Sequence, residues 1–293
     1  LLAPGMNIIR NPLGGRNFEY FAEDPLVTGK IAAAMVNGIQ FNGVGTSVKH
    51  FAVNNQETNR NTVDAVLSER ALREIYLRGF EIAVKESKPW TVMSSYNLVN
   101  GTYTSESYDL LTTILRKEWG FTGIVMTDWF GGKDAVAQMK AGNDLLMPGT
   151  PAQRKAIADA INNKKLDIKV LDENAVRIAA YILRTQAYRN YSFSNKPPLT
   201  QHATLAREAA ASGMVLLQNK EQTLPIKSGI KSIAAFGNTS YNFISGGTGS
   251  GDVNEAYTVS LVEGLTSAGF TVEPELKSIY SAYLYDHQTR NPK

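Results

Sequence analysis

The sequence feature that most constrains the fold is a repeated order of apolar strand, polar loop and amphipathic helix. This order recurs about five times over residues 1–187, with connections of ordinary length. Strands that alternate with helices are typical of a parallel α/β architecture, because each helix returns the chain to the same edge of the sheet. Five units are too few to close an eight-stranded barrel, so we expect an N-terminal part to be missing.

Local signals mark where several of these elements begin. Asp24 is expected to cap a helix over 25–42, with Pro25 in its first position. Ser68 is expected to cap a second helix that runs to about Ser87. Apolar runs of strand length predict further strands at 6–10, 45–53, 90–96, 123–127, 144–148 and, later in the chain, 214–218.

Composition changes in the second half of the chain. Residues 188–200 are rich in Asn, Ser, Tyr and Pro, as expected of a linker. A second α/β pattern follows over 201–293 and contains a Gly-rich stretch, Gly246–Asp252. The chain starts at Leu1 without the features of a protein N-terminus, and the second pattern is unfinished at Lys293. We therefore expect a part of a longer protein.

Composition also limits the kinds of function. A net charge of +3 without a cluster of Lys and Arg does not indicate a nucleic-acid partner. No apolar run approaches the ~20 residues that span a bilayer, so no membrane partner is expected. There are no cysteines and the 3 histidines lie far apart, so we expect neither a metal nor another cofactor. A bacterial periplasmic, secreted or cytoplasmic location stays open, and so does a homodimer.

One short stretch suggests a site. Gly123–Thr127 reads as a buried strand without charge, and Asp128 follows directly, before the aromatic Trp129 and Phe130. A carboxylate at this place either caps the next helix or faces an active site, because barrel enzymes build their sites at the carboxyl ends of the strands. The two alternatives are about equally probable from this stretch alone.

The ends of the other predicted strands also carry polar or aromatic groups that are costly to bury. They are Arg16 after the first strand, Lys49 and His50 at the second, Arg60 in the loop that follows, and Tyr96 at the third. If the strands are parallel neighbours, these groups converge around Asp128 and Trp129. A site lined by these groups suits a carboxylate nucleophile and a polyol substrate, because the hydroxyls of a polyol bind charged groups and its C–H face packs on an indole.

Each of these residues also has a simpler interpretation. Arg16 on its own would more often form an ion pair, here with Glu19 or Asp24. A single His50 is more often a hydrogen-bonded core residue than a catalyst. Aromatic side chains such as Tyr96 and Trp129 usually pack in cores. Only their shared position at the same end of successive strands favours a site.

The sequence resembles the β-glucosidases of glycoside hydrolase family 3 over nearly its whole length. The resemblance rests on several spaced motifs in the right order: Asn11-Pro12, Gly15-Arg16-Asn17-Phe18-Glu19, Glu23-Asp24-Pro25, Lys49-His50-Phe51, Met93-Ser94-Ser95-Tyr96-Asn97, Thr127-Asp128-Trp129 and Gly246–Asp252. It implies the later part of a (β/α)8 barrel followed by the start of an α/β sandwich domain.

The resemblance also assigns roles to residues. Asp128 matches the catalytic nucleophile, Trp129 the indole that borders the sugar subsite, and Ser250 the point where the second domain reaches the site. The residues that match the sugar-binding groups are Arg16, Lys49, His50, Arg60 and Tyr96.

Some parts of the family pattern are absent. An Asp and an Arg from the first third of the barrel have no counterpart here, and the acid/base glutamate lies beyond the end of this chain. Neither Glu255 nor Glu263 stands in a pattern that would make it that acid. The hexosaminidase branch is disfavoured because Ala52–Thr58 lacks the histidine that it carries after the Lys-His-Phe motif.

The resemblance therefore implies a retaining exo-β-glucosidase that acts on β-glucosides or cello-oligosaccharides together with missing segments of the same protein. A β-xylosidase or another β-glycosidase of the family remains an alternative, as does a sugar-binding fragment without turnover. Phosphate binding by Gly247–Gly251 is disfavoured, because the Lys of a phosphate-binding loop is absent.

Overall fold

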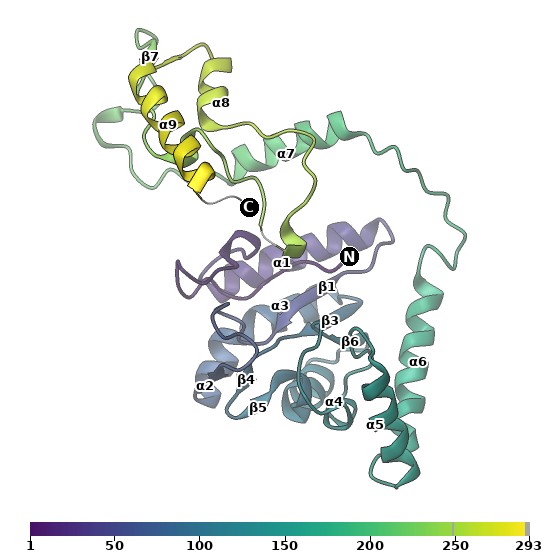
Figure 1. Ribbon diagram of the computed structural model, residues 1–293. Helices are drawn as coiled ribbons and strands as arrows, with labels where there is room; N and C mark the ends of the chain where they lie inside the picture. The colour runs from purple at the N-terminus through teal and green to yellow at the C-terminus, as the bar shows by residue number, and fades with distance from the viewer. Residues whose placement is uncertain (248, 291–293) are drawn as a thin grey trace. The chain divides into compact units, whose positions relative to one another are not determined.

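The computed structural model describes residues 1–247 and 249–290, apart from the side chain of Gln288. It divides into two compact units, Leu1–Ser192 and Phe193–Lys293 (Figure 1). Thr248 of the predicted Gly-rich stretch and residues 291–293 of the predicted second domain lie outside the described residues. Each unit has its own hydrophobic core.

A parallel sheet forms the centre of the first unit. Its order is β1-β3-β6, which are Ser47–Phe51, Thr91–Ser94 and Ile124–Thr127. Parallel bridges extend it at both edges, from Gly5 to Lys49 and from Met126 to Leu145. Neighbours in this sheet are thus its successive strands along the chain, as short connections favour, and the predicted parallel α/β arrangement is confirmed.

Helices connect these strands or follow the last of them in the first unit. They are α1 (Pro25–Phe41), α2 (Glu69–Ala71), the π-helical η2 (Leu72–Tyr76), α3 (Arg78–Ser87), the π-helical η4 (Asp109–Glu118), α4 (Ala135–Ala141), α5 (Pro151–Asn162) and α6 (Ile168–Arg184). The predicted caps are confirmed, since Asp24 accepts from the Val27 amide and Ser68 from the Ala71 amide. The helix that begins after Ser68 is interrupted by its π-helical segment.

Short elements lie in the loops that follow the strands. They are the small ladder of β2 (Asp64–Ala65), β4 (Leu98–Val99) and β5 (Thr102–Tyr103), and the 3-10 turns η1 (Asn17–Glu19) and η3 (Thr104–Glu106). Two of them pair in parallel, β2 with β4, so the loops after β1 and β3 are joined by hydrogen bonds.

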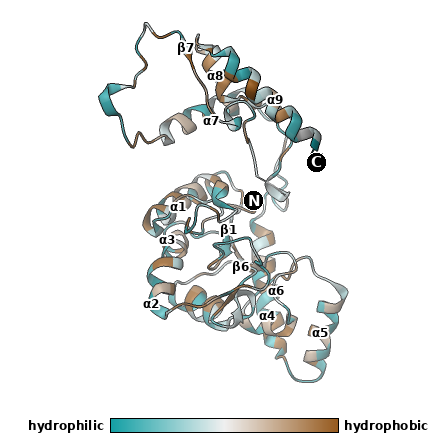
Figure 2. Ribbon diagram, turned by 60° about the vertical axis from the view of Figure 1, so that its left-hand side comes forward, coloured by the Kyte–Doolittle hydropathy of each residue, from teal (hydrophilic) through white to brown (hydrophobic). Residues whose placement is uncertain are grey.

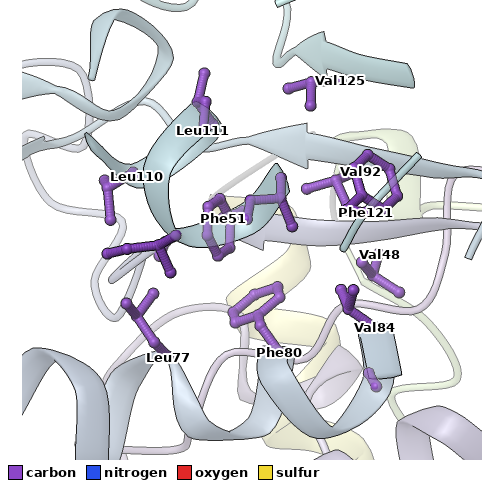
Figure 3. Close-up of a cluster of buried hydrophobic side chains, with 14 of the residues drawn as sticks. Val48, Phe51, Leu77, Phe80, Val84, Val92, Leu110, Leu111, Phe121 and Val125 are labelled. Atoms are coloured by element: carbon purple, nitrogen blue, oxygen red, sulfur yellow. The ribbon is translucent and has the colours of Figure 1, made fainter. Parts of the chain in front are cut away.

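Apolar side chains fill the space between the sheet and the helices (Figure 3). Phe51 of β1 packs edge-to-face on Phe80 of α3, with ring centroids 5.2 Å apart. Val48, Val92 and Val125 supply buried side chains from the three strands. Hydrophilic and hydrophobic residues are mixed along the helices (Figure 2). No helix in the described part of the chain is long and apolar enough to cross a membrane.

The second unit is smaller and contains one short parallel pair, β7 (Ser232–Ile233) with β8 (Thr271–Val272). Its helices are α7 (Leu199–Gly213), α8 (Leu261–Ser267) and α9 (Pro274–Arg290), and its 3-10 turns are η5 (Lys220–Gln222), η6 (Asn238–Ser240) and η7 (Gly249–Gly251). Its core consists of Ala235, Val262 and Val272.

Three strand predictions are wrong. Residues 6–10 form no strand, and the edge pairing occurs instead at Gly5. Residues 144–148 contribute only the bridge at Leu145, and 214–218 have no strand and are exposed. The physical reason is shared, since an apolar run becomes a strand only where a neighbouring backbone offers hydrogen bonds along its length.

Candidate active site

The register of the sheet brings the ends of its strands together. Phe51 pairs with Ser94, and Ser94 pairs with Thr127. The next residue, Asp128, continues the ladder because its amide donates to the Ser94 carbonyl at 3.2 Å. Groups just before Phe51 and just after Ser94 and Thr127 therefore meet at one edge, as the sequence predicted.

Asp128 lies at this edge directly after β6 and is 9% exposed. Its Oδ1 accepts from the Trp129 amide at 2.8 Å, and its Oδ2 is 3.7 Å from His50 Nε2. The negative charge of the same carboxylate acts on the Tyr96 hydroxyl and helps to raise its pKa. The alternative that Asp128 caps the next helix is wrong, because Asp134 caps α4 by accepting from two backbone amides.

His50 is held from several sides and is 1% exposed. Its backbone exchanges two hydrogen bonds with the side chain of Asn7, and its Nδ1 lies 3.4 Å from the Tyr20 hydroxyl. Burial, followed by nearby positive charge, holds the pKa of His50 well below its ordinary value of 6.5. The cations concerned are Arg16, Lys49 and Arg60. His50 is therefore neutral, and its contact with Asp128 is polar rather than an ion pair.

The cations near the site are paired with carboxylates. Glu19 pairs with Arg16 and lies 3.7 Å from Lys49 Nζ, while Glu57 lies 2.6 Å from Arg60 Nη1. The interpretation of Arg16 as an ion-pair former is thus right for Glu19. It does not remove Arg16 from the site, because its charge still acts on the buried imidazole. Paired cations of this kind remain able to donate hydrogen bonds to a neutral polyol.

Tyr96 and Trp129 form the aromatic part of the site. Burial raises the pKa of Tyr96 to about 12, and the negative charge of Asp128 acts in the same direction. The Arg60 guanidinium lies over the Tyr96 ring, 4.6 Å from its centroid, which fixes that ring. Trp129 is 38% exposed, so its indole presents apolar surface beside the carboxylate.

Sequence reasoning missed three supporting residues: Asn7, Glu19 as a partner of Lys49, and Tyr20. Glu19 belongs to the Gly15–Glu19 motif and Tyr20 follows it directly, so their place in the sequence could have indicated that they lie near the site. Ser250 belongs to the second unit, in η7, and its predicted role remains a prediction. Among residues 1–247 and 249–290, no group of three or more His, Cys, Asp or Glu is placed to hold a metal ion.

Comparison with known proteins gives the family. The model of the glycosyl hydrolase family 3 N-terminal domain matches residues 1–181, and that of its C-terminal domain matches residues 214–281. Beta-glucosidase B of Emericella nidulans is 42% identical over 283 residues, which are 94% of this chain and 33% of that protein. An exo-alpha-(1->6)-L-arabinopyranosidase of Bifidobacterium longum is 45% identical over 232 residues, 78% of this chain and 30% of that protein.

A solved structure is similar over both units. Beta-glucosidase 3B from Thermotoga neapolitana, in complex with alpha-D-glucose, gives a TM-score of 0.91 at 49% identity and covers 99% of this chain. The chain spans about a third of the length of the curated relatives and 41% of that solved chain. The expected fold, a partial (β/α)8 barrel followed by the start of an α/β sandwich domain, is confirmed. The chain therefore belongs to glycosyl hydrolase family 3.

Proposed function

We propose that this chain supplies the nucleophile and much of the sugar subsite of a retaining exo-β-glucosidase. The observation that carries the proposal is the setting of Asp128, a buried carboxylate at the end of β6 that accepts from the Trp129 amide and faces a neutral His50. The chain covers only part of its relatives, so the activity is that of a longer protein that contains it. Residues 1–187, 188–200 and 201–293 are its barrel part, linker and sandwich part.

In this proposal Asp128 attacks the anomeric carbon of the terminal glucosyl residue. A carboxylic acid protonates the departing oxygen as the C–O bond breaks, which leaves a glycosyl ester on Asp128. Water then attacks the same carbon, gives its proton to that acid, now a carboxylate, and releases glucose with retained configuration. We place the acid outside this chain, about 5–5.5 Å from Asp128 as retention requires.

The other site residues bind the sugar. Arg16, Lys49 and His50 offer hydrogen-bond donors to its hydroxyls, and the neutral state of His50 allows it to donate without adding charge. Arg60 braces Tyr96 through the cation–π contact. The exposed indole of Trp129 packs on the C–H face of the substrate. We retain for Ser250 the role of a contact from the second domain.

The test uses the full-length gene product and an aryl β-D-glucoside. Asp128→Ala is expected to lower kcat on the order of 10⁴-fold, and azide should then restore release of the aryl group by forming α-glucosyl azide. Asp159→Ala, which changes an exposed carboxylate in α5, is the matched control. Near-full activity of Asp128→Ala, or a product with inverted configuration, would refute the proposal.

A second candidate is an exo-acting α-L-arabinopyranosidase, favoured by the 45% identity to such an enzyme. An α-L-arabinopyranoside carries an equatorial leaving group, as a β-D-glucoside does, but it lacks the hydroxymethyl group and has its C4 hydroxyl axial. The same nucleophile could therefore serve both. Measuring kcat/KM for aryl glycosides of glucose, arabinopyranose and xylose discriminates among them, and a preference for either pentose would overturn the assignment to glucose.

The third alternative is a fragment that binds sugar without turnover. It predicts that the isolated 293-residue chain binds glucose in a calorimetric titration yet releases no aryl group from an aryl β-glucoside. Turnover by the isolated chain would exclude it.

A further inference from the structure

The turn that follows Asp128 is held in an unusual backbone conformation. Phe130 has φ of 61°, a left-handed value that is unfavourable for a non-glycine residue. Its amide donates to the Met147 carbonyl at 2.9 Å, and the amide of Gly131 donates to the Asp128 carbonyl at 3.0 Å. Such a conformation persists only where the surroundings hold it, so the residues that hold this turn bear on the site.

Gln138 of α4 holds the far side of the turn. It is 1% exposed, and its Nε2 donates to the Gly131 carbonyl at 2.6 Å and to Ser105 Oγ at 3.2 Å. Both N–H bonds of the amide are thus used in fixed directions. The backbone carbonyl of Gln138 accepts from the backbone amide of Asn143 at 3.2 Å, and the side-chain Nδ2 of Asn143 donates to the Ser105 carbonyl.

The turn fits closely around this amide. Gly132 has φ of 72°, and a Cβ there would lie 2.1 Å from Gln138 Nε2 and 2.4 Å from Ser105 Oγ. Only glycine allows so close an approach. Glu106 closes the turn by accepting from the amides of Lys133 at 2.5 Å and Asp134 at 2.9 Å.

The peptide groups of this turn also orient the carboxylate. Asp128 Oδ1 accepts from the Trp129 amide, which lies inside the turn. Gly131 connects Gln138 to Asp128, because the Gly131 carbonyl accepts from the Gln138 side chain and the Gly131 amide donates to the backbone carbonyl of Asp128. The Gly131 carbonyl belongs to the 131–132 peptide and its amide to the 130–131 peptide, so Gln138 and the Asp128 carbonyl hold two successive peptide groups of the turn.

We propose that Gln138 is a positioning residue that sets the direction of the Asp128 carboxylate and the Trp129 indole through the Gly131 carbonyl. The proposal rests on the proposed function, in which Asp128 is the nucleophile. A nucleophile displaced by about 1 Å loses on the order of 10²-fold in rate even where the substrate still binds. A role of Gln138 in folding alone would lower stability without changing the rate of attack in the folded enzyme.

The test measures attack directly, by the covalent labelling of the full-length gene product with 2,4-dinitrophenyl 2-deoxy-2-fluoro-β-D-glucoside. This reagent needs little acid assistance, so its rate reports on the nucleophile. Gln138→Met keeps the volume but removes both donors, and Lys140→Met on the exposed face of α4 is the matched control. Intact mass gives the rate, peptide mapping gives the labelled residue, and thermal unfolding gives the folded fraction.

For Gln138→Met we expect a limiting labelling rate ~10–100-fold below wild type, with the half-saturating reagent concentration changed less than about 3-fold. Lys140→Met should label as wild type does. If Gln138→Met does not fold, Gly132→Ala replaces it, because the added Cβ displaces the Gln138 amide without removing it.

Two results separate the proposals. Labelling at the wild-type rate in folded Gln138→Met, or a change in half-saturation alone, overturns the positioning role and leaves the proposed function intact. Labelling of the wild-type enzyme at a residue other than Asp128 overturns the proposed function, and the positioning role falls with it.

Discussion

Replacing Asp144 by asparagine is expected to destabilise the first unit by about 3–5 kcal/mol. The carboxylate is fully buried and joins three parts of the chain. Its Oδ2 is 2.6 Å from Arg116 Nη2 and accepts from the Val125 amide of β6 at 2.8 Å, and its Oδ1 is 2.6 Å from Arg177 Nε of α6. The asparagine amide cannot accept all three bonds, and it removes the buried counter-charge of Arg116 and of Arg177, although Arg177 keeps Glu173 at 3.6 Å.

The magnitude follows from the bonds that are lost and those that remain. Each hydrogen bond to a charged group contributes about 1.5–3 kcal/mol, so three set a ceiling of roughly 4.5–9 kcal/mol. The loss is smaller because Arg116 keeps the carbonyls of Gly123 and Gly142, at 3.0 and 3.1 Å, and Arg177 keeps Asn174 Oδ1 at 2.6 Å. The remainder agrees with the ~3–5 kcal/mol lost when one partner of a buried ion pair is removed.

Urea unfolding followed by tryptophan fluorescence measures this change. All 3 tryptophans belong to the first unit, so the signal reports on that unit alone: Trp90, Trp119 and Trp129. Asp159→Asn is the matched control, because its pair with Lys155 is solvent-exposed. The control is expected to lose at most about 0.5 kcal/mol.

The reasoning is refuted if Asp144→Asn loses no more than about 1 kcal/mol beyond the control. A double-mutant cycle sharpens the test. Adding Arg177→Met to Asp144→Asn removes one of the two cations that have lost this buried partner, so the two losses should fall short of additivity by at least about 1 kcal/mol. Simple additivity would mean that the ion pair contributes little.

Three further predictions follow. The pKa of His50 is lowered below 6.5, so the stability linked to its neutral form is present above pH 6.5 and is lost as pH falls, by up to about 1.4 kcal/mol per pH unit. His50→Gln should reduce this loss when the free energy of unfolding is measured from pH 7 to 5, and an unchanged slope contradicts the prediction. Tyr96→Phe removes the hydroxyl on which the Asp128 charge acts and should lower kcat of the full-length gene product about 10–100-fold at unchanged unfolding temperature, whereas kcat within twofold of wild type contradicts a role for this hydroxyl. Gly123→Ala places a Cβ 2.2 Å from a backbone carbonyl next to β3 and should lower the free energy of unfolding by about 2–3 kcal/mol. Gly38→Ala in α1, where the Cβ meets nothing within 4 Å, should raise it by about 0.5–1 kcal/mol, and equal effects of the two variants would refute the packing argument.

The features that sequence reasoning predicted correctly depend on neighbouring residues. Asp24 and Ser68 cap helices because their side chains reach amides three residues ahead. The strand before Asp128 is short, apolar and buried, which its own composition indicates. Once such strands are parallel and in sequence order, the groups that follow them must meet at one edge of the sheet. The sequence left two interpretations of Arg16, a site residue or an ion-pair former, and the structure shows its pair with Glu19.

The features that sequence reasoning missed depend on residues far apart in the chain. Residues 214–218 are as apolar as a strand but have no neighbouring backbone to pair with. The Gln138 amide reaches the turn after Asp128 only because η3 and α4 pack together. No local pattern indicates that such a donor will be buried against a particular carbonyl.

The order of elements, the parallel sheet and the place of Asp128 at a strand end were thus determined by the sequence itself, because they arise from local periodicity and from the geometry of parallel strands. The electrostatic state of the site was decided by tertiary packing. Burial keeps His50 neutral, and the positive charges of Arg16, Lys49 and Arg60 act in the same direction. The charge of Asp128 acts on Tyr96 because β3 and β6 lie side by side. Burial and distance between remote side chains set these properties, and both exist only in the folded chain.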